Sequence, residues 1–272
     1  MVQLWAMLSV VFLVMILVVY FKFHKVKDRK YIQTKGINLV KELRLVLYFL
    51  QKHRGLSSQK LKGKTGLENS IKDIQTNTQK VITRIASTNS EIMANELWLS
   101  VTEHWLKLSK SYVNYSVDNN VSQHNSMIQN LLYLIDDIAV SHELSRLKLP
   151  DIEDIRLIWK EWLTAIECIG QARALGSAIL AEGTCGSVSR IRLSYLQEKI
   201  TATTQLAWKG IPASESQKSL INSLLACIKI EIINASNSNN LSLDSSDYFT
   251  QCSEVMDVYY QEFDHVFDEL RV

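Results

Sequence analysis

Proline and glycine are scarce in this sequence, which contains 2 and 9 of them among 272 residues. Both residues mark turns and interrupt helices, so their scarcity argues against a fold of many short strands joined by turns. Over residues 31 to 272, apolar side chains recur at helical spacings in long segments and do not alternate. The sequence therefore predicts an all-α fold.

Cysteine is also scarce, and motifs for catalysis or metal binding are lacking. The four cysteines lie far apart, and the six histidines include no pair at the i, i+4 spacing of helical metal ligands. The segment Gly63-Lys64-Thr65 ends like a phosphate-binding loop, but Ser58 stands where that loop needs its first glycine. We therefore expect no catalytic residue, no metal ion and no cofactor.

Charged side chains are balanced in number but unevenly placed. The 30 basic and 28 acidic residues give no electrostatic reason to expect a nucleic-acid partner. From Met1 to Phe21 no side chain is charged, and the apolar run 4–21 would be about 27 Å long as a helix, close to the thickness of a bilayer. We predict that residues 4–21 span a membrane, within an anchor of residues 1–30. A cleavable signal peptide is the weaker interpretation, because no basic residue precedes the run.

Five basic residues follow the predicted span directly: Lys22, Lys25, Lys27, Arg29 and Lys30. Positive charge next to a membrane span is retained on the cytoplasmic side. The sequence therefore predicts a single-pass protein of the inner or plasma membrane, with residues 31–272 as one domain in the cytoplasm.

Eight helices are expected in that domain. Their predicted ranges are 31–54, 66–88, 91–115, 121–147, 151–182, 187–209, 213–235 and 244–270. Gly55 and Gly63 are expected to end the first, a polar loop to fill 234–247, and Asp244 or Ser245 to cap the last. Helices of this length with short connections favour two stacked antiparallel bundles.

Two arginines continue apolar helical stripes. The stripes run through Leu39, Leu43, Leu47 and Leu50 to Arg54, and through Trp162, Ile166 and Ile169 to Arg173. A buried guanidinium needs an anionic partner, which is either an acidic side chain or a small bound anion. Neighbouring positions on the two stripes offer no carboxylate. The alternative is that the arginine stems lie on apolar surface while the head groups reach water.

These observations predict an anion pocket shared by Arg54 and Arg173, with Arg192 at its edge. Hydroxyl donors would come from Ser57, Ser58 and Ser177. A planar oxyanion such as nitrate or nitrite suits this set, because arginine presents a rigid fork of N–H donors. Arg190 lies nearer a polar helix face, so a solvated role is expected for it.

The two arginine segments resemble the nitrate- and nitrite-sensing domain of bacterial signalling proteins. The segment Leu50 to Ser57, LQKHRGLS, is similar to the opening signature of that family, and Gly170 to Gly176, GQARALG, to its second half. The resemblance covers roughly residues 36 to 270. It implies two four-helix bundles that bind nitrate or nitrite between them through arginines from different helices.

Two positions depart from the family pattern. His53 stands where members usually carry a charged residue, so one pocket contact is either missing or sensitive to pH. For an arginine of the seventh helix the nearest candidate is Lys229, and lysine cannot form a bidentate fork. Whether His53 or Lys229 contributes to the pocket stays open at this point.

Family members usually carry an output module, and none is recognised in this sequence. We therefore expect the signal to pass to a separate protein or a second copy of the chain. The final helix carries an apolar stripe that offers a docking surface or closes the bundle: Val255, Val258, Phe263, Val266 and Phe267. The rival function is a helical scaffold that senses nothing and uses its arginines in structural ion pairs.

Overall fold

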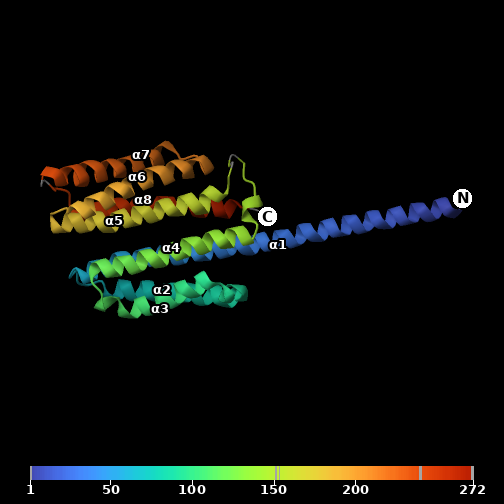
Figure 1. Cartoon of the computed structure of the whole chain (residues 1–272), viewed down its shortest axis with the longest axis horizontal. Coiled ribbons are helices and arrows are strands. Elements are labelled where there is room, and N and C mark those ends of the chain that lie inside the picture. The colour runs from blue at the N-terminus through green and yellow to red at the C-terminus, as the bar shows by residue number, and fades with distance from the viewer. Residues whose placement is uncertain (1, 151, 153, 239–240, 271–272) are drawn as a thin grey trace.

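The computed structural model describes residues 2–150, 152, 154–238 and 241–270, and it describes their side chains except at 2–12, 14, 18, 237 and 238. The described residues form eight α-helices and no strand, which confirms the all-α prediction. The helices are α1 (Val2–Leu61), α2 (Glu68–Thr88), α3 (Glu96–Ser111), α4 (Val117–Ser141), α5 (Leu163–Glu182), α6 (Ser187–Gly210), α7 (Glu215–Cys227) and α8 (Ser245–Glu269) (Figure 1). Two π-helical segments, Ile158–Trp162 and Ile228–Asn234, adjoin α5 and α7.

The helices pack in two groups of four, which lie side by side along their lengths (Figure 1). In the first group α1 contacts α2 and α4, and α3 contacts α4. In the second group α5 contacts α6 and α8, and α7 contacts α8. The two groups meet where α1 and α4 contact α5 and where α1 contacts α8. The helices that carry Arg54 and Arg173 are therefore neighbours.

Several helices begin at polar residues whose side chains accept hydrogen bonds from the first turn. Asn95, Ser116 and Ser214 do this for α3, α4 and α7, and Ser214 with Gln217 forms a complete capping box. Asp244 accepts from the backbone N–H groups of Ser246 and Asp247, which confirms a predicted cap of the final helix. At the other end of α5, Gly183 adopts the left-handed conformation (φ 65°) that favours glycine.

The predicted helix end at Gly55 is wrong. The helix α1 runs without interruption through Gly55 to Leu61, and the chain turns only at Gly63 and Gly66, which both have positive φ. Gly55 is buried against the ring of Phe249 and the guanidinium of Arg173. A Cβ atom at this position would lie 3.5 Å from its nearest neighbour, an ordinary contact, so the glycine neither ends the helix nor is required by close packing.

Other boundaries differ from the prediction by a few residues. The helix predicted from residue 121 begins earlier, at Val117 after the cap Ser116, so that Asp118 and Asn119 lie in the first turn of α4. The helix expected from residue 151 begins only near residue 156, and a π-helical segment precedes α5. The polar segment expected as a loop from residue 234 continues first as a 3₁₀ turn, Ala235–Ser238.

The final helix is part of the core of the second group. Val255, Phe263, Val266 and Phe267 are buried, and the rings of Phe263 and Phe267 stack with centroids 4.3 Å apart. On the next turns of the same face, the indole N–H of Trp162 donates to the backbone carbonyl of Tyr259 at 2.8 Å. The interpretation of this stripe as a free docking surface is therefore wrong, since it closes the helical bundle.

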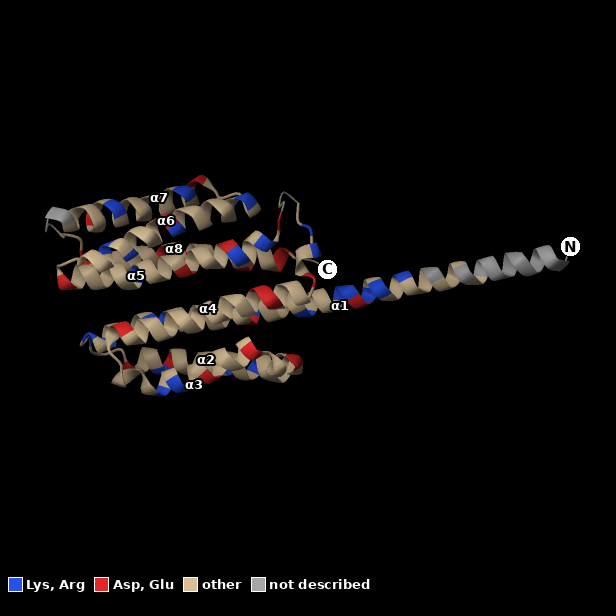
Figure 2. Ribbon diagram, in the orientation of Figure 1, with Lys and Arg blue, Asp and Glu red and all other residues tan. Residues whose placement is uncertain are grey.

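The N-terminal part of α1 extends away from the two groups of helices (Figure 1). Its described apolar side chains between residues 13 and 23 are exposed, and the basic residues that follow lie where α1 leaves the bundle (Figure 2). Among the residues that the structure describes, no helix combines the length and apolar character that a membrane span requires. The side chains of residues 4–12, 14 and 18 lie outside the described ones, and the span over residues 4–21 stays a prediction.

Candidate functional site

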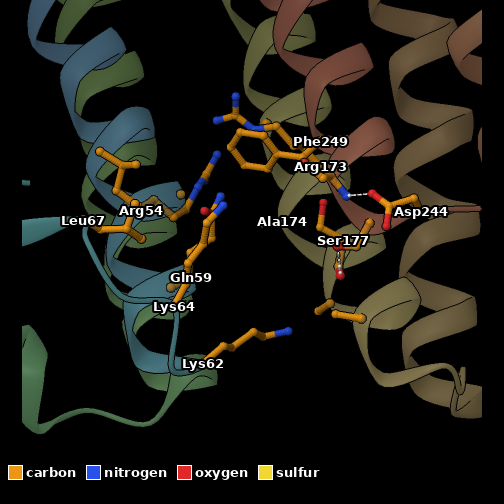
Figure 3. Close-up of a pocket in the computed structure, with 18 residues that line it drawn as sticks. Arg54, Gln59, Lys62, Lys64, Leu67, Arg173, Ala174, Ser177, Asp244 and Phe249 are labelled. Carbon is orange, nitrogen blue, oxygen red and sulfur yellow. Dashed lines mark hydrogen bonds between the residues drawn. The ribbon is translucent and has the colours of Figure 1, made fainter. Parts of the chain in front are cut away.

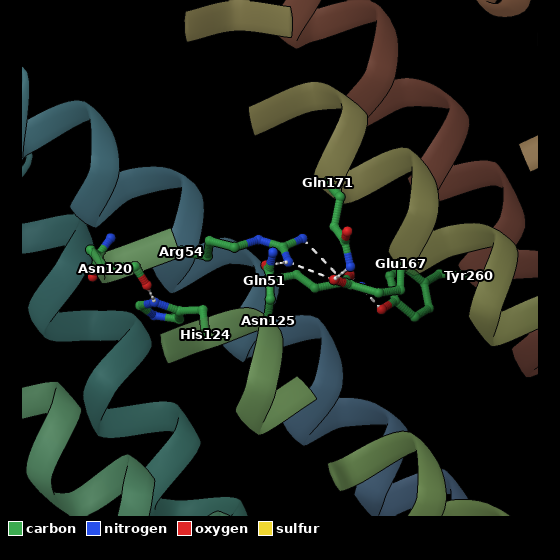
Figure 4. Close-up of polar contacts among 8 residues, drawn as sticks. All are labelled: Gln51, Arg54, Asn120, His124, Asn125, Glu167, Gln171 and Tyr260. Atoms are coloured by element: carbon green, nitrogen blue, oxygen red, sulfur yellow. Dashed lines mark hydrogen bonds and ion pairs between the residues drawn. The ribbon is translucent and has the colours of Figure 1, made fainter. Parts of the chain in front are cut away.

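Arg54 lies on the bundle-facing side of α1 and is 1% exposed, so its predicted burial is confirmed. Its Nη1 donates to Glu167 Oε1 and to Asn125 Oδ1, both at 2.6 Å, and its Nη2 donates to Glu167 Oε2 at 3.1 Å (Figure 4). This bidentate contact joins α1 to α5, and the bond to Asn125 joins it to α4. Arg54 therefore has an acidic partner within the chain.

Glu167 is 3% exposed and accepts hydrogen bonds on both oxygens. Besides Arg54, the amide of Gln51 donates to Oε2 at 2.8 Å and that of Gln171 to Oε1 at 2.9 Å. The hydroxyl of Tyr260 on α8 donates to Gln51 Oε1 at 2.7 Å, which extends the network to a fourth helix (Figure 4). A carboxylate with this many donors compensates the Arg54 charge and fixes its position.

Arg173 has the same sequence context as Arg54 but different partners. It is 6% exposed, its Nη1 donates to Ser253 Oγ at 2.8 Å, and its guanidinium carbon lies 4.5 Å from the centre of the Phe249 ring. No acidic side chain of the described residues forms an ion pair with it. Burial, and then the nearby charge of Arg54, lower the pKa of the Arg173 guanidinium from its ordinary value. An anion placed beside Arg173 would relieve this cost.

Each guanidinium lies against a glycine of the opposite helix. A Cβ atom on Gly170 of α5 would lie 2.7 Å from Arg54 Nη2, and one on Gly55 of α1 would lie 3.7 Å from Arg173 Nη2. Gly170 is therefore required for the close approach of Arg54, whereas the contact between Gly55 and Arg173 would also accommodate a methyl group. The sequence indicated two matched copies but not this reciprocal packing.

A cavity of about 490 Å³ lies beside these arginines, between α1, α5 and the start of α8 (Figure 3). Arg54, Arg173 and Phe249 line it toward the middle of the bundles, and Lys62 and Lys64 line it toward the end of α1. Arg173 and Phe249 also border a second cavity of about 510 Å³. A ligand that occupies either cavity would therefore contact the buried Arg173 guanidinium.

Two of the three serines predicted for the pocket line the cavity, and the third faces away from it. Ser58 and Ser177 line the cavity, and Ser177 Oγ is buried with no hydrogen-bond partner among the described residues. Ser57 faces the first helical group, where its Oγ donates to the carbonyl of His53 at 2.6 Å and accepts from Asn120 Nδ2 at 2.9 Å. Ser57 is therefore placed away from the cavity.

Arg192 and Lys229 also lie outside this cavity. Arg192 is exposed on α6 and lines a neighbouring space of about 550 Å³ between α4, α5 and α6. Lys229 is exposed on the π-helical segment that follows α7. The structure therefore brings together Arg54, Arg173, Ser58 and Ser177, and it separates Arg192 and Ser57 from them.

His53 also faces away from the cavity and forms a buried pair with His124 of α4. His53 Nδ1 lies 2.8 Å from His124 Nε2, and His124 Nδ1 lies 2.7 Å from the carbonyl of Asn120. The amide of Gln75 lies 3.1 Å from His53 Nε2. Only one direction of donation satisfies all of these contacts with neutral rings, from Gln75 through His53 and His124 to the carbonyl. Burial lowers the pKa of His53 to about 4, and burial followed by repulsion from His53 lowers that of His124 well below its ordinary value.

Sequence reasoning missed the acidic partner, Glu167. Its signal is a single carboxylate within the otherwise apolar stretch from Trp162 to Gly170 of the α5 segment. A lone acidic residue in such a stretch is almost never buried unless it is paired. The sequence offered no means of choosing between Arg54 and Arg173 as the partner, because that choice depends on the crossing of α1 and α5.

Comparisons with known proteins give no assignment. No protein-family model matches the chain, and neither a curated protein nor a solved structure matches it.

Proposed function

We propose that this chain is a membrane-anchored cytoplasmic sensor that binds a small oxyanion, nitrate or nitrite, in the cavity between α1 and α5. In this proposal Arg173 is the main residue that binds the anion, and the hydroxyls of Ser177 and Ser58 donate further hydrogen bonds. Arg54, which is paired with Glu167, contributes only part of the cavity wall. The observation that carries the proposal is the buried Arg173 guanidinium, which borders a cavity and hydrogen-bonds only to a neutral serine among the described side chains.

The charges of the site favour one negative charge over two. Glu167 compensates Arg54, so the buried pair of arginines leaves an excess of one positive charge at Arg173. A monovalent oxyanion would neutralise that excess, and a divalent one would leave an uncompensated negative charge. The guanidinium fork and a hydroxyl also match the planar arrangement of oxygens in nitrate and nitrite.

Signalling would follow from the position of the cavity between helices of different groups. An anion that contacts both α1 and α5 stabilises the arrangement in which the two helices are close, and so it biases any equilibrium that changes their separation. In this proposal a separate protein, or a second copy of the chain, detects that change. The exposed apolar side chains of α1 between residues 13 and 23, followed by basic ones, support the membrane anchor.

A helical scaffold that binds no anion is the second candidate, and one observation favours it. Arg54 is a full member of a buried ion pair with Glu167, as expected for an arginine with a purely structural role. The scaffold offers no acidic partner for Arg173, whose guanidinium contacts a serine and the Phe249 ring.

Thermal unfolding of the full-length chain in detergent separates the two candidates. We expect millimolar nitrate or nitrite to raise the unfolding temperature in a concentration-dependent manner, because a ligand selective for the folded state stabilises it by mass action. Sulfate and chloride at matched ionic strength are the controls for charge and for salt. Equal shifts with all four anions, or no shift, would support the scaffold.

A further inference from the structure

The cavity beside Arg173 is larger than a four-atom oxyanion needs. Its volume is about 490 Å³, whereas a water molecule takes up about 30 Å³ of liquid. Clefts that bind organic molecules have volumes of about 300–1,000 Å³. Nitrate at Arg173 would therefore leave most of the cavity to water, and a larger molecule fits the space better.

The walls beyond Arg173 are mostly apolar. Leu56 and Leu67 line the side formed by α1 and the turn after it, and Ala178 and Ala181 line the side formed by α5. Phe249 covers the end next to Arg173 (Figure 3). Apolar surface around one buried cation and a few hydroxyls is the usual composition of a site for a small organic ion.

The charges around the cavity allow one negative charge on the ligand. Two of the basic residues that line the cavity already have acidic partners. Arg54 is paired with Glu167, and Lys62 Nζ lies 3.7 Å from Glu182 Oε1. The remaining lining charges are Lys64, Arg173 and Asp244, which add up to one positive charge. The Asp244 carboxylate is already engaged in capping α8, where it accepts from the backbone N–H groups of Ser246 and Asp247.

We infer that this cavity also binds a second class of ligand, an organic monocarboxylate with a compact apolar body. Its carboxylate accepts from the Arg173 guanidinium and from Ser177 Oγ, which is buried and lacks a partner among the described residues. Its apolar body lies along Ala178 and Ala181, opposite Leu56 and Leu67. This inference rests on the anion-binding part of the proposed function and adds a larger monoanion that competes with nitrate for the same guanidinium.

Calorimetric titration of the full-length chain in detergent with benzoate, acetate, nitrate and benzyl alcohol tests the inference. Benzoate is the probe, acetate lacks the apolar body, and benzyl alcohol lacks the charge. We expect benzoate to bind at least about tenfold more tightly than acetate, because the ring is removed from water, and benzyl alcohol to bind much more weakly. In the variant Arg173→Ala, the affinity for benzoate and for acetate should each fall by about tenfold or more.

A second variant, Ala178→Phe, fills the apolar part of the cavity. It should abolish benzoate binding while nitrate still binds. The control is Ala226→Phe, at an exposed position of α7, which should bind benzoate as tightly as the unmodified chain. Benzoate no tighter than acetate, or benzoate binding unchanged by Arg173→Ala, would overturn the inference while Arg173-dependent nitrate binding keeps the proposed function. Benzoate binding without nitrate binding would contradict nitrate as the ligand and support the inference, and failure of all the anions would contradict both.

Discussion

At the scale of single residues, two arginines of matched sequence context meet different environments. Arg54 faces Glu167 across the contact between α1 and α5, whereas Arg173 points toward α8 and finds Ser253 and the ring of Phe249. The difference arises because the buried carboxylate of α5, Glu167, lies about 1.7 helical turns before Arg173 and faces α1. One arginine therefore holds the helices together, and the other is available to a ligand.

Replacing Arg54 should therefore damage the fold more than replacing Arg173. We expect Arg54→Ala to lower the free energy of unfolding by about 3–5 kcal/mol, because Glu167 would be left buried without its cation. The double variant Arg54→Leu, Glu167→Leu should be less destabilised than Arg54→Ala alone. Arg173→Ala should change the stability of the anion-free protein by less than about 1 kcal/mol, since burial already disfavours this charge. Urea unfolding in chloride measures all three, and equal losses at Arg54 and Arg173 would contradict the assignment.

The His53–His124 pair makes stability sensitive to pH. Burial lowers the pKa of His53 to about 4, so between an unfolded pKa near 6.5 and that value the unfolded chain binds more protons than the folded one. The contribution of the neutral His53 to the free energy of unfolding is therefore fully present above about pH 6.5 and is lost progressively as the pH decreases toward 4. His53 alone should account for about 2 kcal/mol between pH 7 and pH 5.

The measurement is the difference in unfolding free energy between pH 7 and pH 5, and not the stability at either pH. This difference should become smaller in His53→Gln, whereas the exposed His265→Gln should leave it unchanged. A His53→Gln variant with the full pH dependence would show that other groups cause it.

At the scale of helices, a glycine of α5 sets how closely α8 approaches, whereas a glycine of α1 does not. Gly176 faces the buried ring of Tyr248, and a Cβ atom there would lie 2.4 Å from the ring. The Tyr248 hydroxyl donates to the carbonyl of Ala172 at 3.0 Å, which holds the ring in place. A Cβ atom on Gly55, in contrast, would lie 3.5 Å from its nearest neighbour, a ring carbon of Phe249.

The two glycines should respond in opposite directions to the same substitution. Gly176→Ala should destabilise the protein by about 1–3 kcal/mol, because the Tyr248 ring must move within a packed core. Gly55→Ala should be neutral or stabilise by up to about 1 kcal/mol, because alanine has the higher helix propensity and the added methyl meets only ordinary contacts. Thermal unfolding of both variants is the measurement, and a larger loss for Gly55→Ala would contradict the packing described here.

At the scale of the whole molecule, local signals in the sequence predicted most of the helices. Periodicity and caps such as Asp244 located most of them to within a few residues, although α1 is much longer than the predicted 31–54. The apolar stripes correctly indicated that Arg54 and Arg173 are buried. Gly55 was misread, because a glycine that ends a helix and one inside a helix look alike in sequence. The Glu167 partner and the displacement of Arg192 to another cavity depend on how α1, α5 and α6 cross, which no local pattern encodes.

The orientation of the whole chain in a membrane is a further prediction. The exposed apolar part of α1 and the basic residues after it predict, by the positive-inside rule, that the helical groups lie in the cytoplasm. A reporter enzyme that is active only outside the cytoplasm, fused after Val272, should be inactive, and a cytoplasm-dependent reporter at the same position should be active. The reverse pattern would place the cavity outside the cell, and recovery of both fusions without membranes would remove the anchor from the account.

The most direct test of the central claim, that Arg173 is an anion ligand, is calorimetric titration of the full-length chain with nitrate. We expect saturable binding to the unmodified chain and to Arg192→Ala, since Arg192 lines a different cavity. Arg173→Ala should show no saturable binding while remaining folded. Nitrate binding that survives Arg173→Ala, or is lost only in Arg192→Ala, would contradict the claim.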